Sequence, residues 1–328
     1  MIEMLSLPMM QRALMAALLS GLMAPAIGTY IVQRRLSLLG DGLGHVAVAG
    51  VGLSFLTGTA PLPLAITVCV LGAVAVELLR QQGRATGDVG LAVLFYGGLA
   101  SGVMMAGLGG QGTGALSQFL FGSLTTVSSM DVQVVAVLAV LVVLFCVGLW
   151  PRLFAVSADE DFSRVLGLRV RWLNLLVVVL AAVTVTMSMR TVGLLLVSAM
   201  MVIPVATAQN LFISFRACLF GAMAFGATVA FGGTVGSYYW NTASGATIVV
   251  CAIAVFLLTW PLTALRHRRL AVLERQEQEQ HDEQDHVICE EPPHSHDGYH
   301  VAIQHGDHVD YLHYGHRHAP HGDHFDEH

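Results

Sequence analysis

The chain has 328 residues, of which 55% are hydrophobic and only 12% are charged, and its mean hydropathy is +0.67. Soluble globular proteins carry about 25% charged residues, so this composition excludes an ordinary soluble enzyme and indicates a polytopic membrane protein. The formal net charge of −6 is unevenly divided, because residues 1–270 hold 14 Arg against 8 acidic residues, whereas residues 271–328 hold 2 Arg against 14. Thirteen of the 15 histidines also lie between His281 and His328. We therefore expect a transmembrane domain over 1–270 and an acidic, His-rich tail over 271–328.

Nine apolar runs are long enough to cross a bilayer as helices. They cover residues 9–32, 41–57, 62–79, 89–107, 131–150, 172–189, 191–208, 217–236 and 245–264. The second run is short and Gly-rich, and eight spans remain if it enters the membrane without crossing. Arginines such as Arg34, Arg80, Arg164 and Arg216 fall at alternate ends of these spans, as expected for cytoplasmic loops. The pattern predicts an all-α membrane protein with eight or nine transmembrane helices and a cytoplasmic tail.

Several classes of site are missing from the sequence. The chain contains no lysine, so it has no phosphate-binding loop of the GxxxxGK[ST] form. An ATPase that drives this protein must therefore be another chain. The five cysteines stand singly, without a disulfide or CxxC pattern. No HExxH motif, no nucleophile with a base and no catalytic carboxylate pair is evident, so an enzyme is not expected.

Two ionisable residues lie at the start of the second apolar run. Asp41 and His45 are four residues apart, so a helix places them on one face. Ionisable residues inside a membrane usually face a bundle interior or a water-filled path, and a carboxylate with an imidazole suits Zn²⁺ or Mn²⁺. The alternatives are a helix-capping role for Asp41 and a hydrogen bond from His45 to a neighbouring carbonyl.

The tail has a composition that favours disorder, after a helical extension to about residue 280. Its imidazoles lie two to four residues apart with carboxylates between them, and neutral imidazole is a ligand for zinc, nickel and copper. The tail histidines that we predict to bind metal weakly are His294, His296, His305, His308, His313, His316, His318, His321, His324 and His328. The alternative is a solvated extension without a binding role.

Local patterns predict further features of the loops. Ser157-Ala-Asp-Glu160 has the form of a capping box and predicts a short helix over 158–166, closed by Gly167. Glu77 and Arg80 are spaced for an interfacial ion pair, and we expect Asp131 to cap the fifth span.

The segment 34–58 reads RRLSLLGDGLGHVAVAGVGLSFLTG. It resembles the signature of the membrane permeases of zinc/manganese-type ABC importers, whose usual form is roughly RRMSLLGDALSHAALPGVALAFLLG. The likeness covers residues 10–265 and includes LFGSL at 120–124, RVLGLR at 164–169, GLLLVS at 193–198, IPVATA at 203–208 and SGAT at 244–247. This sequence departs from the signature at Gly42, Gly44 and Ala49.

The resemblance implies a permease of the type II ABC importer kind in a bacterial plasma membrane. It implies that Asp41 and His45 form an intramembrane metal site, with a homodimer of permeases, a separate cytoplasmic ATPase and an external metal-binding receptor as partners. By likeness to cobalamin-type importers, the segment 204–216, after the seventh span, is the favoured ATPase-coupling element, with the helix at 158–166 as the other candidate. The coupling residues are Pro204, Thr207, Gln209, Asn210 and Arg216.

The His tail favours zinc as the cargo, with manganese or iron as alternatives, and no permanently bound cofactor is expected. A secondary cation transporter that uses no ATP, and a membrane-anchored metal sensor, are the alternatives outside this family.

Overall fold

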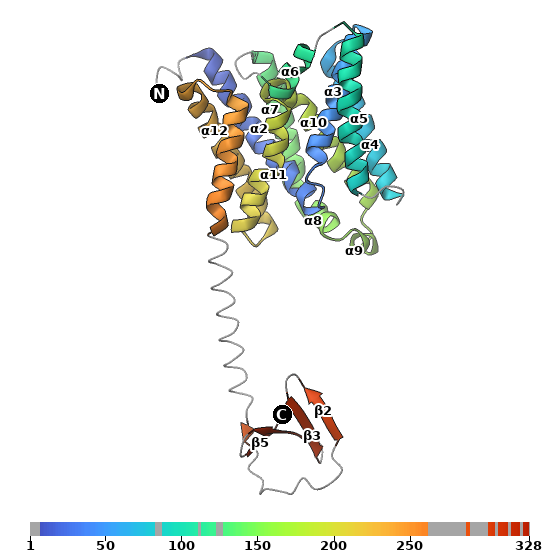
Figure 1. Cartoon of the computed structure of the whole chain (residues 1–328), viewed down its shortest axis with the longest axis vertical. Helices are drawn as coiled ribbons and strands as arrows, with labels where there is room; N and C mark the ends of the chain where they lie inside the picture. The colour runs from blue at the N-terminus through green and yellow to red at the C-terminus, as the bar shows by residue number, and fades with distance from the viewer. Residues whose placement is uncertain are drawn as a thin grey trace. The chain divides into compact units, whose positions relative to one another are not determined.

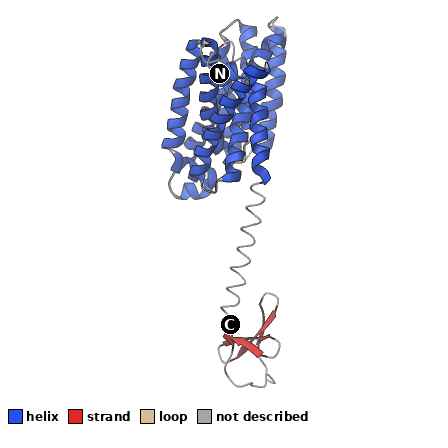
Figure 2. Ribbon diagram, turned by 90° about the vertical axis from the view of Figure 1, so that its left-hand side faces the viewer, coloured by secondary structure: helices blue, strands red, loops and turns tan. Residues whose placement is uncertain are grey.

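The computed structural model describes residues 7–82, 87–110, 113–122, 127–261, 287–288, 301–305, 308–313, 316–321 and 324–327. The chain divides into two units, Met1–Pro261 and Leu262–His328, which are treated separately below. The first unit is a bundle of helices, and the second contains the strands (Figures 1 and 2).

Within the described residues, nine helices are long and apolar enough to cross a membrane. They are α2 (Pro8–Gln33), α3 (Leu39–Thr57), α4 (Pro61–Gln81), α5 (Gly87–Leu108), α7 (Ser129–Gly148), α10 (Val170–Val192), α11 (Leu194–Leu211), α12 (Phe215–Trp240) and a last span, Ser244–Pro261. The nine predicted runs are thus confirmed, with ends that shift by a few residues. The second run forms a helix of 19 residues and has the largest buried share of the nine, 78%.

The interior of the bundle is built around α2 and α3. Helix α3 packs against α4 and α5, whereas α2 packs against α7, α11 and α12. Glycine permits close contact between α3 and α5, because a Cβ on Gly98 of α5 would lie 2.7 Å from the carbonyl carbon of His45 in α3. A Cβ on Gly102 would likewise lie 2.9 Å from the carbonyl oxygen of Val48. A Cβ on Gly232 of α12, by contrast, would meet nothing within 4 Å.

Helix α7 begins with a capping box. The Ser128 hydroxyl accepts a hydrogen bond from the backbone N–H of Asp131, and the Asp131 carboxylate accepts one from the backbone N–H of Ser128, both at 3.1 Å. Asp131 therefore does cap this span, as predicted, as the reciprocal partner of Ser128.

Gly193 is the single residue between α10 and α11, with φ 88° and ψ 153°, a conformation that is essentially restricted to glycine.

Two short helices follow α7 at the end of the bundle that carries Arg34, Arg80 and Arg164, called here the arginine-rich end. They are α8 (Trp150–Ala158) and α9 (Glu160–Val165), and both lie at this end in Figure 1. A third short helix, α6 (Thr113–Phe121), was not predicted from the sequence.

The predicted helix over 158–166 is partly wrong. Ser157 lies in α8, and the residue that caps α9 is Asp159, whose carboxylate accepts from the Phe162 backbone N–H at 2.9 Å. An aspartate placed directly before the helix replaces the expected serine because either side chain can accept this bond. Gly167 ends the segment with φ 76°, as predicted.

The predicted coupling element over 204–216 is not a separate helix. Pro204 and Thr207 are buried within the spanning helix α11, which continues to Leu211. The seventh span was predicted to end at residue 208, before the polar residues Gln209 and Asn210, but the helix continues through them to Leu211. Only three residues, 212–214, separate α11 from α12.

The tail contains a five-stranded antiparallel sheet with the order β1-β5-β4-β3-β2. Its strands are β1 (Val287–Ile288), β2 (Val301–His305), β3 (His308–His313), β4 (His316–His321) and β5 (His324–Glu327). The composition-based prediction that the tail is largely disordered stays a prediction. In the sequence, two residues that include glycine separate each pair of strands from β2 to β5, a spacing typical of hairpins.

Candidate functional site

Asp41 and His45 lie where the sequence predicted, on one face of the second spanning helix. Asp41 is in the first turn of α3, and its Oδ1 atom lies 3.9 Å from Nε2 of His45. Two donors at tetrahedral angles around Zn²⁺ or a similar ion stand about 3.4 Å apart when each bond is about 2.1 Å. The pair is therefore close to the separation at which one divalent ion can bind both side chains.

The surroundings of the pair keep His45 fixed and leave Asp41 accessible. The His45 ring packs edge-on against Phe95 of α5, with 4.2 Å between ring centroids. The side chain of His45 is 11% exposed, whereas that of Asp41 is 30% exposed. Asp41 is thus the more accessible side chain of the two.

One nitrogen of His45 is buried without a partner. Its Nδ1 atom makes no hydrogen bond in the structure, although buried polar atoms are nearly always satisfied. Leu38, at the N-cap of α3, supplies no side-chain cap, and Asp41 makes no capping bond either. The alternatives of a capping aspartate and a structural hydrogen bond from His45 are therefore not supported by the geometry.

The pair has no third ligand of the usual kinds within the spanning bundle. Among the residues whose side chains the structure describes, no three His, Cys, Asp or Glu side chains gather closely enough to hold a metal ion.

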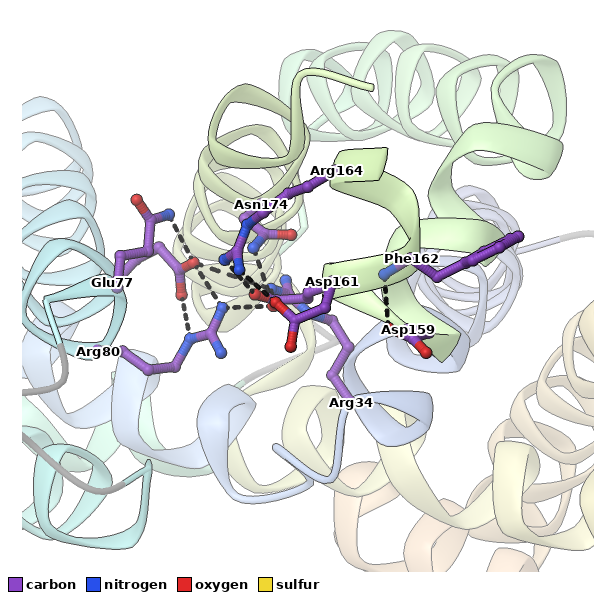
Figure 3. A network of polar contacts seen from close by, with 10 residues as sticks. Arg34, Glu77, Arg80, Asp159, Asp161, Phe162, Arg164 and Asn174 are labelled. Carbon is purple, nitrogen blue, oxygen red and sulfur yellow. Dashed lines mark hydrogen bonds and ion pairs between the residues drawn. The ribbon is translucent and has the colours of Figure 1, made fainter. Parts of the chain in front are cut away.

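A network of charged side chains joins four elements at the arginine-rich end (Figure 3). Its centre is Glu160 of α9, whose Oε1 atom accepts hydrogen bonds from Arg34 at 3.0 Å, Arg80 at 2.8 Å and Asn174 at 3.0 Å. Arg80 also forms the predicted pair with Glu77, through two bonds of 2.9 Å each. In this pair the side chain of Glu77 is 3% exposed and that of Arg80 is 26% exposed, so the pair is partly buried at the end of the bundle.

The network fixes the protonation of its central carboxylate. Burial acts to raise the pKa of Glu160, but hydrogen bonds and charges from Arg80 and Arg34 outweigh this effect and hold the pKa below its ordinary value. Glu160 is therefore ionised at neutral pH. The Glu77–Arg80 pair is predictable from its spacing. The contacts of Arg34, Glu160 and Asn174 were not predicted, because most of them join residues that are far apart in the chain.

The predicted coupling residues are scattered rather than gathered. Gln209 is exposed and Asn210 half-buried at the end of α11. Arg216, in the first turn of α12, places its guanidinium 5.1 Å from the ring centroid of Trp150 in α8. With Pro204 and Thr207 buried in α11, these residues form no continuous surface.

Of the tail histidines that were predicted to bind metal, some lie in the strands and the others lie outside the described residues. His305, His308, His313, His316, His318, His321 and His324 lie in β2 to β5. His294, His296 and His328 lie outside the described residues.

Comparisons with known proteins agree with the architecture of the bundle. The model of the ABC 3 transport family matches residues 6–262. The manganese transport system membrane protein MntC of Halalkalibacterium halodurans is 30% identical over 259 residues, which cover 79% of this chain and 88% of that protein. The high-affinity zinc uptake system membrane protein ZnuB of Haemophilus influenzae is 24% identical over 247 residues, which cover 75% and 95% of the two chains.

A solved structure shows the same likeness. The structure of PsaBC from Streptococcus pneumoniae in complex with Fab includes a chain that is 28% identical to this one, with a TM-score of 0.71. The match covers 79% of this chain and 94% of that chain. With a family match that extends over most of its length, this multi-pass membrane protein belongs to the ABC 3 transport family, as one of its permeases.

Proposed function

We propose that the chain is the permease subunit of an ATP-driven importer of a divalent transition metal, with zinc as the cargo. The observation that carries the proposal is the Asp41–His45 pair, in which a carboxylate and an imidazole stand 3.9 Å apart on a spanning helix. In this proposal the ion exchanges water for these two ligands as it passes, and the exposed carboxylate binds it before the imidazole does. The names of MntC and ZnuB support a transition metal as the cargo class.

Zinc is favoured by ligand chemistry, because imidazole and carboxylate together suit it well. Manganese is the second candidate, since it prefers carboxylate and other oxygen ligands and since MntC is named for manganese transport. Competition between the two ions in one uptake assay separates these candidates.

The ATPase in this proposal docks on α8 and α9 at the arginine-rich end. Phe162, Val165 and Leu166 are 59%, 84% and 57% exposed there, and exposed apolar groups of this kind mark protein-binding surfaces. Ile213, in the short connection between α11 and α12, is 85% exposed. This surface replaces the segment 204–216 as the proposed main contact, although residues 212–214 stay part of it.

The remaining partners follow from the family. We infer a homodimer of permeases in a bacterial plasma membrane, a receptor that delivers the ion from outside and a tail on the cytoplasmic side. The arginine-rich end is the cytoplasmic one in this orientation. The last span, Ser244–Pro261, then ends on the cytoplasmic side.

Metal uptake into proteoliposomes that contain the permease, its ATPase and its receptor tests the proposal. Asp41→Asn and His45→Asn each remove a ligand, and we expect each to lower ATP-dependent ⁶⁵Zn uptake roughly tenfold or more. Asp131→Asn is the control, because it changes a carboxylate that caps α7. Full uptake by both site variants, with normal assembly, contradicts the proposed path, and uptake driven by a proton gradient without ATP establishes a secondary transporter instead.

A further inference from the structure

Helix α9 turns polar side chains toward the bundle. Of its six residues, Glu160 and Ser163 are at least partly buried, and the other four are exposed. A short helix that buries little apolar surface has little stability of its own. The hydrogen bonds that Glu160 accepts from Arg34 and Arg80 therefore tie α9 to the ends of α2 and α4.

A tight turn connects Arg34 with Asp41, which lies seven residues later. The backbone N–H of Leu36 donates to the carbonyl oxygen of Ile31 in α2 at 3.0 Å, and that of Leu39 donates to the carbonyl oxygen of Leu36 at 2.9 Å. Helix α3 begins at Leu39 and carries Asp41 in its first turn. Because the turn is hydrogen-bonded to α2 and to the start of α3, a movement of Arg34 is passed on to Asp41.

The network around Glu160 contains hydrogen-bonding groups that it does not use. Arg34 and Asn174 each donate to the Glu160 carboxylate, yet Nε of Arg34 and Oδ1 of Asn174 are buried without a partner, as is the hydroxyl of Ser163. Buried polar atoms are nearly always satisfied. These free groups are available to a second arrangement of the same side chains, which an element that couples two sites requires.

We propose that Glu160 and Arg34 are positioning residues for transport, and that their contact links α9 to the carboxylate of Asp41. A shift of α9 pulls on Arg34 through Glu160, and the turn after Arg34 carries the shift to the first turn of α3. The inference rests on the proposed function, in which the ATPase docks on α8 and α9. It adds the path by which that docking surface acts on the Asp41–His45 pair.

The first test measures ⁶⁵Zn uptake and ATP hydrolysis in the same proteoliposomes, which contain the permease, its ATPase and its receptor. The readout is the amount of zinc transported per ATP hydrolysed, because a permease that is merely destabilised loses both rates together. We expect Glu160→Gln and Arg34→Gln each to lower this ratio by about fivefold or more, as is typical of a lost coupling between sites. The double variant should lower it no further, because both side chains belong to one link.

Arg80→Gln is the matched control. It removes the other guanidinium that donates to Glu160 and leaves the carboxylate of Glu77, which is 3% exposed, with less compensation. We therefore expect a lower Tm, as for Glu160→Gln. Arg80 lies at the end of α4 and not beside the turn into α3, so the ratio of zinc to ATP should stay within about twofold of the wild-type value.

Amide hydrogen exchange follows the same link without any metal. In nanodiscs that contain the permease and its ATPase, a non-hydrolysable ATP analogue should change the exchange over residues 36–42 in the wild type and in Arg80→Gln. The change should be absent in Glu160→Gln and Arg34→Gln. A wild-type complex that shows this change but transports no zinc supports the link and contradicts the proposed cargo.

Three results overturn the inference. The first is an equal fall in the ratio of zinc to ATP for Glu160→Gln and Arg80→Gln, which indicates a purely structural network. The second is a double variant in which the two losses multiply, since the side chains then act independently. The third is an exchange pattern over residues 36–42 that does not respond to nucleotide in the wild-type complex.

Discussion

Replacing Glu160 by Gln removes the negative charge on which the guanidinium groups of Arg34 and Arg80 converge. Arg80 keeps its two bonds of 2.9 Å to Glu77, but Arg34 is left with Glu77 at 3.8 Å as its nearest carboxylate. The side chain of Arg34 is 5% exposed, so water cannot compensate its charge.

The size of the effect follows from this geometry. Breaking a buried ion pair by removing one partner costs about 3–5 kcal/mol. The lower end of this range applies because Glu77 still faces Arg34 and because the Glu160 side chain is 26% exposed. A loss of about 3 kcal/mol corresponds to a decrease in Tm of about 6–12 °C for a unit of this size.

The assay is thermal unfolding of the purified protein in detergent, followed by the fluorescence of a thiol-reactive dye. Such a dye reports unfolding because Cys69, Cys146 and Cys218 are buried in the folded bundle. The control is Asp161→Asn, which changes the adjacent carboxylate. The side chain of Asp161 is 89% exposed and pairs with Arg164 at the surface, so we expect a change below about 1 kcal/mol. Equal melting temperatures for the two variants would refute the role of Glu160 as the centre of the network.

Three further predictions concern the same bundle. The pKa of Glu160 lies below its ordinary value of about 4.3, so the ionised carboxylate stabilises the fold above that pH. The Tm difference between wild type and Glu160→Gln should therefore persist from pH 7 to pH 5 and narrow only as the pH falls below about 4. Gly98→Ala places a Cβ 2.7 Å from the backbone of His45, and we expect it to lower the free energy of unfolding by about 1–3 kcal/mol and to lower metal uptake. Gly97→Ala is the control and should change neither stability nor uptake, because a Cβ there meets nothing within 4 Å. Asp159→Ala removes the cap of α9 and should destabilise this helix by about 1 kcal/mol, seen as faster amide hydrogen exchange over 160–165, and unchanged exchange would contradict the capping role.

Features that depend on local sequence were predictable. The nine spans follow from apolar length, and the shared face of Asp41 and His45 follows from their four-residue spacing. The Glu77–Arg80 pair and the capping role of Asp131 also involve residues three positions from their partners. Such contacts are set by helix geometry, so a pattern in the sequence is sufficient to find them.

Features that depend on packing between distant segments were not predictable. Glu160 meets Arg34 and Arg80 across separations of 126 and 80 residues, and no periodic pattern connects such positions. The end of the seventh span was misplaced for a related reason. Its predicted end at residue 208 comes directly before Gln209 and Asn210, which resemble the start of a polar loop, but α11 continues through both residues to Leu211.

The tail carries two signals in its sequence. Its low apolar content favours disorder, and that prediction stays untested. The two-residue segments between β2 and β5, each of which includes glycine, are typical of hairpins.

The single residue between α10 and α11 decides where reporter groups can be inserted on the face opposite the arginine-rich end. An epitope tag at Gly193 would push apart two spanning helices that share one glycine as their whole connection. The three residues between α3 and α4, 58–60, are exposed and can receive a tag without separating packed helices. Topology mapping of this protein should therefore use the turn after α3. A failed insertion at Gly193 would report how short the connection between α10 and α11 is, rather than the side of the membrane on which this connection lies.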